Sequence, residues 1–315
     1  MSRRLLPLLL AFASAPSLAQ TAMVWGETEV IGLEKMPREQ VLAQLPIRPG
    51  SRVDQKEKEM LRWCERVRRL PLAAVSCTGT VIGEELHYVV EVVESPDAKL
   101  RLQPATGAPV SDKLPGEIRK LLSHREYRIQ EMAAEGTAPV EGVTPSGVVI
   151  GEDSELRMYD VQIRDACIGR RETLIAMVLD GRNGERRVAA QLLAWAGDPE
   201  ASIARVHHRL LDPDSEMRNL IGRLILTFAD RIQDPDIAEA VANSLLAQLA
   251  LPTLTDRTKA LGGLGKLLAH HPELHARLRE VAQAPLEKIA RESVLPTIGG
   301  EARGLLNLLN RVEAR

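Results

Sequence analysis

The chain of 315 residues is poor in aromatic residues and in cysteine. Phe, Trp and Tyr together make up 3% of it, and three cysteines are present. Proteins that bind single-stranded nucleic acids stack the bases on aromatic rings, so this composition argues against such a platform. Leu, Ala and Val must fill the core, which favours helical packing.

An excess of one charge is also missing. Lys and Arg total 41, Asp and Glu total 43, and the formal net charge is −2. A nucleic-acid-binding domain usually carries a basic excess on one face. We therefore expect no nucleic-acid partner.

Long apolar runs are absent beyond the N-terminus. Arg3 and Arg4 precede the apolar run 5–12 and a stretch of small residues that ends in Ser-Leu-Ala. This order is typical of a secretory signal peptide, which we place at residues 1–19 with cleavage before Gln20. No later run approaches the roughly 20 apolar residues of a membrane-spanning helix. We expect an exported, periplasmic protein without a transmembrane segment in its mature chain.

Familiar catalytic motifs are missing as well. The sequence contains no G-x-S-x-G, H-E-x-x-H, Walker-type G-x-x-x-x-G-K or strand-linked G-x-G-x-x-G. The glycines of "ALGGLGKLLA" (260–269) lie within a helical segment, where they favour close helix packing over a phosphate cradle. We predict no catalytic residue and no cofactor.

Two histidine clusters are candidates for a reactive or metal-binding site. His271 and His275 have the i, i+4 spacing of zinc ligands, but Pro272 separates them and no third ligand lies nearby. The sequence therefore favours an exposed helix junction, with a metal-dependent enzyme as the less favoured alternative. We expect no serine or cysteine nucleophile to be placed with His207 and His208, which disfavours a general-base role.

The segment after the signal, residues 20–97, alternates strand and helix patterns. Strands are predicted at 23–33, 73–82 and 86–94, and helices at 37–45 and 55–70. Gly83-Glu84-Glu85 is predicted as a short hairpin loop. Pro37 suits a first helical turn, and Asp54 with Glu57 suggests a capping box for the second helix.

The first two cysteines fall on elements of this segment. Cys64 lies on the apolar stripe of the second predicted helix, and Cys77 shares one strand face with Val75 and Gly79. If both faces point inward, the thiols lie near one another. A disulfide and two buried free thiols both remain open.

The order and landmarks of this segment resemble a POTRA domain, the polypeptide-transport-associated module of outer-membrane assembly and secretion proteins. The resemblance rests on "EVIGLEKMPREQVLAQLPIRPGSRVD", "LRWCERVRRL" and "LHYVVEVVE". It implies a β-α-α-β-β fold whose hairpin strand 73–82 is a sheet edge. Extended peptides add to such edges through main-chain hydrogen bonds.

Residues 98–158 are predicted as a linker with one amphipathic helix at 117–135, because the flanking stretches are rich in Pro, Gly, Ser and Thr. From 159 to 315, helical segments recur between Gly, Asp-Pro or Pro breaks. The apolar quartet within 189–194 returns 31 residues later at 220–225 and a further 40 later at 260–265. Such periods indicate stacked helix pairs, an α-solenoid.

The stretch "DPEASIARVHHRLLDPDSEMRNLIGRL" resembles a HEAT repeat, with Asp212-Pro213-Asp214 at its turn and Arg218 just inside its second helix. The whole chain thus resembles exported bacterial HEAT-repeat proteins with an N-terminal POTRA-like domain. A row of cations recurs at the starts of second helices and is interpreted as ion-paired to preceding Asp turns, with a ligand-binding ridge as the alternative. Its members are Arg186, Arg187, Arg218, Arg257 and Lys259.

The third cysteine, Cys167, is interpreted as a buried small side chain, and pairing with a partner is the alternative. The sequence favours a non-enzymatic interaction scaffold that binds a protein or peptide through the sheet edge, the solenoid groove, or both. An accessory role in outer-membrane protein assembly or secretion is the second hypothesis. The candidate edge residues are Val75, Ser76, Cys77, Thr78, Thr80 and Val81.

Overall fold

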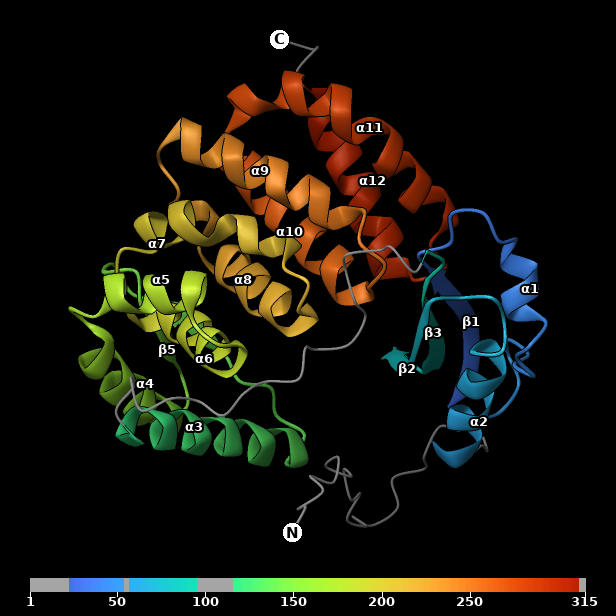
Figure 1. Cartoon of the computed structure of the whole chain (residues 1–315), viewed down its shortest axis with the longest axis horizontal. Helices are drawn as coiled ribbons and strands as arrows, with labels where there is room; N and C mark the ends of the chain where they lie inside the picture. Colours follow the sequence, from blue (N-terminus) through green and yellow to red (C-terminus); the bar gives the residue numbers. More distant parts are fainter. Residues whose placement is uncertain (1–22, 54–56, 96–115, 312–315) are drawn as a thin grey trace.

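The computed structural model describes residues 23–53, 57–95 and 116–311 of the chain (Figure 1). A small mixed sheet near the N-terminus is followed by helices, so the expectation of an α+β part and then an all-α part holds. The predicted signal peptide, its cleavage before Gln20 and the capping residue Asp54 lie outside the described residues.

The N-terminal part has the predicted β-α-α-β-β order, and its sheet has the strand order β1-β3-β2. β1 runs parallel to β3, and β2 runs antiparallel to it. The hairpin loop is shorter than predicted: only Gly83 and Glu84 form it, and Glu85 already pairs with Ile82. Gly83 has a φ of +61°, which lets two residues close the turn. The elements are β1 (Val24–Ile31), α1 (Arg38–Leu42), α2 (Glu57–Val67), β2 (Ala74–Ile82) and β3 (Glu85–Val93).

The central strand β3 is buried on both faces. Tyr88, Val90 and Val92 join a core with Trp63 and Cys64 of α2. Val89, on the opposite face, belongs to the core of the helical part. The sheet is therefore a layer between its own two helices and the long helical stack, as Figure 1 shows.

Two buried carboxylates join the sheet to the helical part. The Glu91 carboxylate of β3 accepts a hydrogen bond from the Leu254 N–H at 2.8 Å, and the Glu29 carboxylate of β1 accepts one from the Val294 N–H at 2.8 Å. The Leu254 N–H lies at the start of the helix Leu254–His270, where the backbone leaves donors unpaired, and the Val294 N–H lies in the connection before the helix Pro296–Asn310. The two parts are thus held together through specific polar contacts as well as apolar packing.

The interval predicted as a linker is more structured than expected. Its helix is α3 (Gly116–Ala134), close to the predicted 117–135, but a hairpin of β4 (Glu141–Val143) and β5 (Val149–Gly151) follows. The predicted boundary at 158/159 falls inside α4 (Ser154–Cys167). These elements were not predicted, because three-residue strands are too short to show an alternating pattern. Asp153 caps α4 by accepting from the Leu156 N–H.

The recurrent helical segments predicted from residue 159 onward correspond to helices of the structure. α5 packs on α6, α9 on α10 and α11 on α12, and α10 also contacts α8 and α12. Asp214 and Asp234 cap α8 and α9 through their side chains. α11 continues through Pro285. The helices are α5 (Arg171–Asp180), α6 (Asn183–Leu192), α7 (Pro199–Val206), α8 (Ser215–Phe228), α9 (Pro235–Leu249), α10 (Leu254–His270), α11 (His275–Glu292) and α12 (Pro296–Asn310).

Candidate functional site

The strand β2 is an edge of the three-stranded sheet, at the place the sequence analysis assigned to it. It pairs with β3 along all nine of its residues, Ala74 to Ile82. No other described segment makes a backbone hydrogen bond to it. Within the part of the chain that the structure describes, its outer main-chain groups are therefore unpaired with another strand.

The six candidate residues differ in what they present to solvent. Val81 is 55% exposed, and Thr78 is exposed as well. Ser76 and Thr80 are half-buried, whereas Val75 is buried. Side-chain contacts with a partner would thus come from Thr78 and Val81, and the buried Val75 anchors the strand.

The opposite edge of the sheet is partly covered. The residues before α2 return along β1, where the Trp25 N–H donates to the Ser51 carbonyl at 2.8 Å and the Gly50 N–H donates to the Trp25 carbonyl at 2.7 Å. The Arg38 guanidinium of α1 donates to the Thr28 carbonyl at 2.6 Å. β2 is consequently the more accessible edge.

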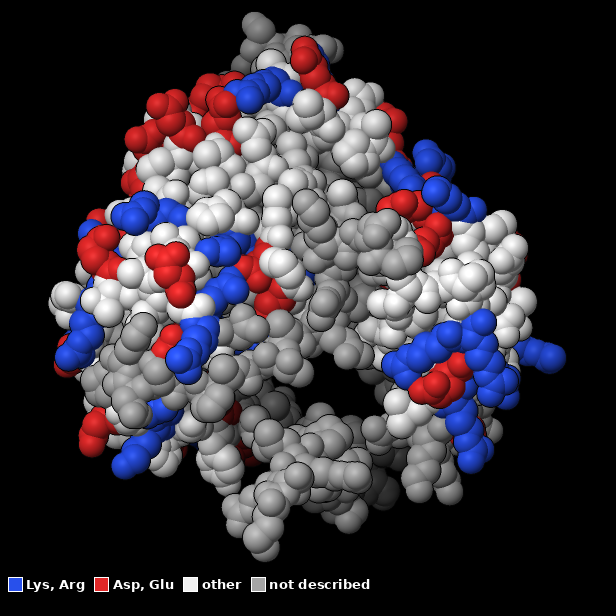
Figure 2. Space-filling view, in the orientation of Figure 1, with Lys and Arg blue, Asp and Glu red and all other residues white. Residues whose placement is uncertain are grey.

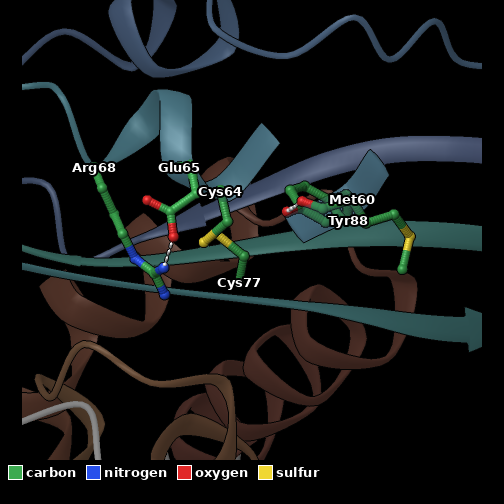
Figure 3. Close-up of a disulfide and its surroundings, with 6 residues drawn as sticks. All are labelled: Met60, Cys64, Glu65, Arg68, Cys77 and Tyr88. Atoms are coloured by element: carbon green, nitrogen blue, oxygen red, sulfur yellow. Dashed lines mark hydrogen bonds and ion pairs between the residues drawn. A yellow bond between two sulfur atoms is a disulfide. The ribbon is translucent and has the colours of Figure 1, made fainter. Parts of the chain in front are cut away.

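A disulfide fixes β2 to α2 (Figure 3). Cys64 of α2 and Cys77 of β2 are bonded, and their Cα atoms lie 5.9 Å apart. The Tyr88 hydroxyl of β3 donates to the Met60 carbonyl of the same helix at 2.9 Å. Burial raises the pKa of Tyr88 to about 12, so this hydroxyl remains a donor. Of the two alternatives left open for the cysteine pair, the structure shows the bridge.

Three members of the row of cations form ion pairs within the helical part. Arg186 contacts Asp212, the Arg187 Nε lies 2.7 Å from the Asp214 carboxylate, and Arg218 binds Asp256 through both Nε and Nη2. These arginines form ion pairs with aspartates, as interpreted. Each of them, however, pairs with an aspartate later in the chain and not with the preceding Asp turn. The stacking of the helices thus places the start of α6 beside the turn before α8, and the start of α8 beside the start of α10.

The last two members of the row behave differently. Arg257 lies 3.9 Å from the Glu29 carboxylate of β1, so it belongs to the junction with the sheet. Lys259 forms no ion pair with a described residue, and burial lowers its pKa. The five cations therefore do not form one continuous ridge.

His271 and His275 bind backbone carbonyls. The His271 Nε2 lies 2.9 Å from the Ile232 carbonyl, and the His275 Nε2 lies 2.8 Å from the Leu268 carbonyl. His271 precedes α11, as predicted, but both side chains are buried, so the junction is not the exposed one that was expected. Among the described residues, no group of three or more His, Cys, Asp or Glu side chains is arranged to hold a metal ion.

A serine does lie beside His207, contrary to the sequence-based expectation. The His207 Nδ1 is 2.8 Å from the Ser244 hydroxyl of α9. That hydroxyl donates to the Ala240 carbonyl at 3.1 Å, so the His207 Nδ1–H is the donor to the serine oxygen. A general base would have to accept the serine proton instead, so this pair joins two helices rather than activating a nucleophile.

Cys167 is buried in the helical core, and burial raises its pKa to about 12. Its thiol is therefore held in the unreactive protonated form. In the described part of the chain, no helix has the length and apolar character that crossing a bilayer requires. Figure 2 shows acidic and basic side chains interspersed over the face in view, without a broad surface of one sign.

Comparisons with protein-family models, with curated proteins and with solved structures found no match to this chain.

Proposed function

We propose that this chain is a non-enzymatic periplasmic interaction scaffold that binds an extended segment of a protein partner along β2. One observation carries the proposal: β2 is a nine-residue sheet edge to which no other described segment pairs, while the β1 edge is partly covered. Unpaired N–H and C=O groups along an edge form hydrogen bonds with an added strand.

The disulfide supports this use of the strand. An edge that must order itself on binding loses affinity through the entropy of ordering. Cys77 sits in the middle of β2 and is bonded to α2, while Val75 is buried beneath the same helix. The strand is thus pre-formed, and the exposed Thr78 and Val81 supply selectivity beside the main-chain bonds.

We further propose that the N-terminal part is POTRA-like and that the helical part is a HEAT-like solenoid. The β-α-α-β-β order supports the first assignment. The packed helix pairs, with aspartates capping α7, α8 and α9, support the second. Export to the periplasm rests on the sequence of residues 1–19 alone.

Site-specific photo-crosslinking tests the proposed edge. Benzoylphenylalanine at Val81 should crosslink to a partner in the bacterium that makes the protein, because that side chain is 55% exposed on β2. Val281 of α11 is the matched control, since it is 57% exposed but lies far from β2 in sequence and on another element.

The edge proposal predicts an adduct at Val81 that is absent at Val281. A Thr78→Lys substitution should weaken the adduct, because charged side chains blunt sheet edges. Identical adduct patterns at the two valines, or no adduct at Val81, would contradict the proposal.

A further inference from the structure

A cleft lies at the junction between the sheet and the helical part. Its volume is about 840 Å³, within the roughly 300–1,000 Å³ that small-ligand pockets occupy. The ends of β1 and β3 form one wall, and the α9–α10 connection with the last turns of α11 forms the other. None of the lining residues belongs to β2, so the cleft is separate from the proposed edge site. Figure 2 shows acidic and basic side chains together between the end of α11 and α1.

Two carboxylates of the cleft are already occupied by backbone donors. Glu29 accepts from the Val294 N–H at 2.8 Å. Glu94 accepts from the N–H groups of Glu34, Lys35 and Met36 at 2.9–3.1 Å. These carboxylates stabilise the cleft wall and are not free to receive a cationic ligand.

Two cations of the cleft, the side chains of Arg257 and Lys288, form no hydrogen bond with a described residue. Arg257 is 18% exposed, its buried Nε has no hydrogen-bond partner, and its nearest carboxylate oxygen, on Glu29, is 3.9 Å away. Lys288 of α11 is exposed and forms no hydrogen bond or ion pair with a described residue. A buried Nε–H without a hydrogen-bond partner is costly, and a carboxylate added beside the guanidinium can accept from more than one of its donors.

The remaining lining is largely apolar. Leu33, Met36, Leu251, Pro252 and Ile289 surround the charged groups. Gly32 keeps this wall close: it has a φ of +92°, and a Cβ there would lie 2.7 Å from the Pro252 Cβ. The cleft thus combines an unsatisfied cation with apolar surface, which suits a ligand that has a carboxylate beside an apolar body.

We infer that the junction cleft binds the free C-terminal carboxylate of a short apolar peptide segment, with Arg257 and Lys288 as its cationic contacts. A peptide fits better than a fatty acid because the exposed Glu34 carboxylate on the same lining can accept main-chain N–H groups. The arrangement favours a carboxyl terminus, because an internal segment or a terminal amide lacks the charge that would form a hydrogen-bonded pair with Arg257.

Fluorescence anisotropy with a fluorescein-labelled peptide, Gly-Leu-Ala-Val-Leu, tests the inference on the purified protein. The peptide with a free carboxylate should bind about tenfold or more tightly than its C-terminal amide, because a hydrogen-bonded charge pair is lost in the amide. This comparison needs no variant and so does not depend on refolding.

Variants then locate the site. Arg257→Met should weaken binding of the acid peptide about tenfold and remove the difference between acid and amide. Lys288→Met, at an exposed position, should weaken it in the same direction by a smaller factor. Arg231→Met, an exposed arginine outside the cleft, is the control and should bind as the wild type does.

Equal binding of acid and amide, or no binding of either at about 1 mM, would overturn the inference. So would equal affinities of the Arg257→Met and Arg231→Met variants. Binding of dodecanoate without binding of the acid peptide would contradict the peptide assignment. Thr78→Lys on β2 should leave peptide binding unchanged, so failure here is distinguishable from failure of the edge proposal.

Discussion

Arg218 is a fully buried arginine whose charge is neutralised inside the helical part. Its Nε and Nη2 bind the Asp256 carboxylate, and its Nη1 donates to the Asp212 carbonyl at 2.9 Å. Thr253 and Gln248 complete the hydrogen bonding of Asp256. The sequence indicated that Arg218 pairs with an aspartate, but it could not identify Asp256, because 38 residues separate the two.

Asp256→Asn should destabilise the protein by about 3 kcal/mol, because it leaves the Arg218 guanidinium buried without a counter-charge. Urea unfolding followed by circular dichroism measures the change. Asp230→Asn, at an exposed position, is the control and should stay within about 0.5 kcal/mol of the wild type. Equal unfolding midpoints for the two variants would show that the buried pair is not stabilising.

At the scale of elements, long segments with apolar periodicity could be predicted. Short strands and the covering of a sheet edge could not. The strand-helix order of the N-terminal part and the segments that became α5–α12 followed from apolar periodicity. The β4–β5 hairpin was missed, since it lies in a stretch rich in glycine and proline, and the predicted boundary at 158/159 divided α4. That β2 is an edge was predicted, but the covering of β1 depends on how residues 50–53 fold back, which no local pattern shows.

The link between β2 and α2 makes a prediction at this scale. Reduction of the Cys64–Cys77 bond should lower the free energy of unfolding by about 3 kcal/mol, because the crosslink closes a short loop in the unfolded chain. The two cysteines are 13 residues apart. Urea unfolding with and without dithiothreitol measures the loss.

The Cys64→Ala, Cys77→Ala double variant is the control for this experiment. It should unfold at the same urea concentration with or without the reductant, because the buried Cys167 forms no bond that reduction can break. A comparable response of the wild type and the double variant to dithiothreitol would contradict the assigned bridge.

At the scale of the whole molecule, the sheet and the helical part form a shared junction. The Glu91–Leu254 and Glu29–Val294 bonds connect residues 163 and 265 positions apart. The sequence presented Glu91 only as one position of a strand, so neither this junction nor its cleft could be predicted. Contacts between distant segments depend on how the sheet and the helical part pack together. Composition and apolar periodicity do not predict that packing.

The junction should respond to pH through Glu91. Burial is the largest influence on this carboxyl and raises its pKa above the ordinary value, although the Leu254 N–H opposes the rise. A raised pKa in the folded state means that Glu91 contributes most to stability below its unfolded pKa. That contribution is lost as the pH rises through the folded pKa.

Glu91→Gln does not titrate, so its stability relative to the wild type should increase between about pH 4 and about pH 7. Urea unfolding at several pH values measures this difference. Glu280→Gln, at an exposed site on α11, controls for the loss of one carboxylate. A relative stability of Glu91→Gln that falls with rising pH would contradict the assigned direction.

The central claim, that a partner pairs with β2 through its main chain, is tested most directly by amide hydrogen exchange. Exchange is measured residue by residue along Ala74–Ile82, with and without the partner segment identified by crosslinking at Val81. Strand addition protects alternate amides of β2, since only every second N–H of an edge strand points outward. Unchanged exchange along β2, with new protection confined to the helical part, would contradict the account.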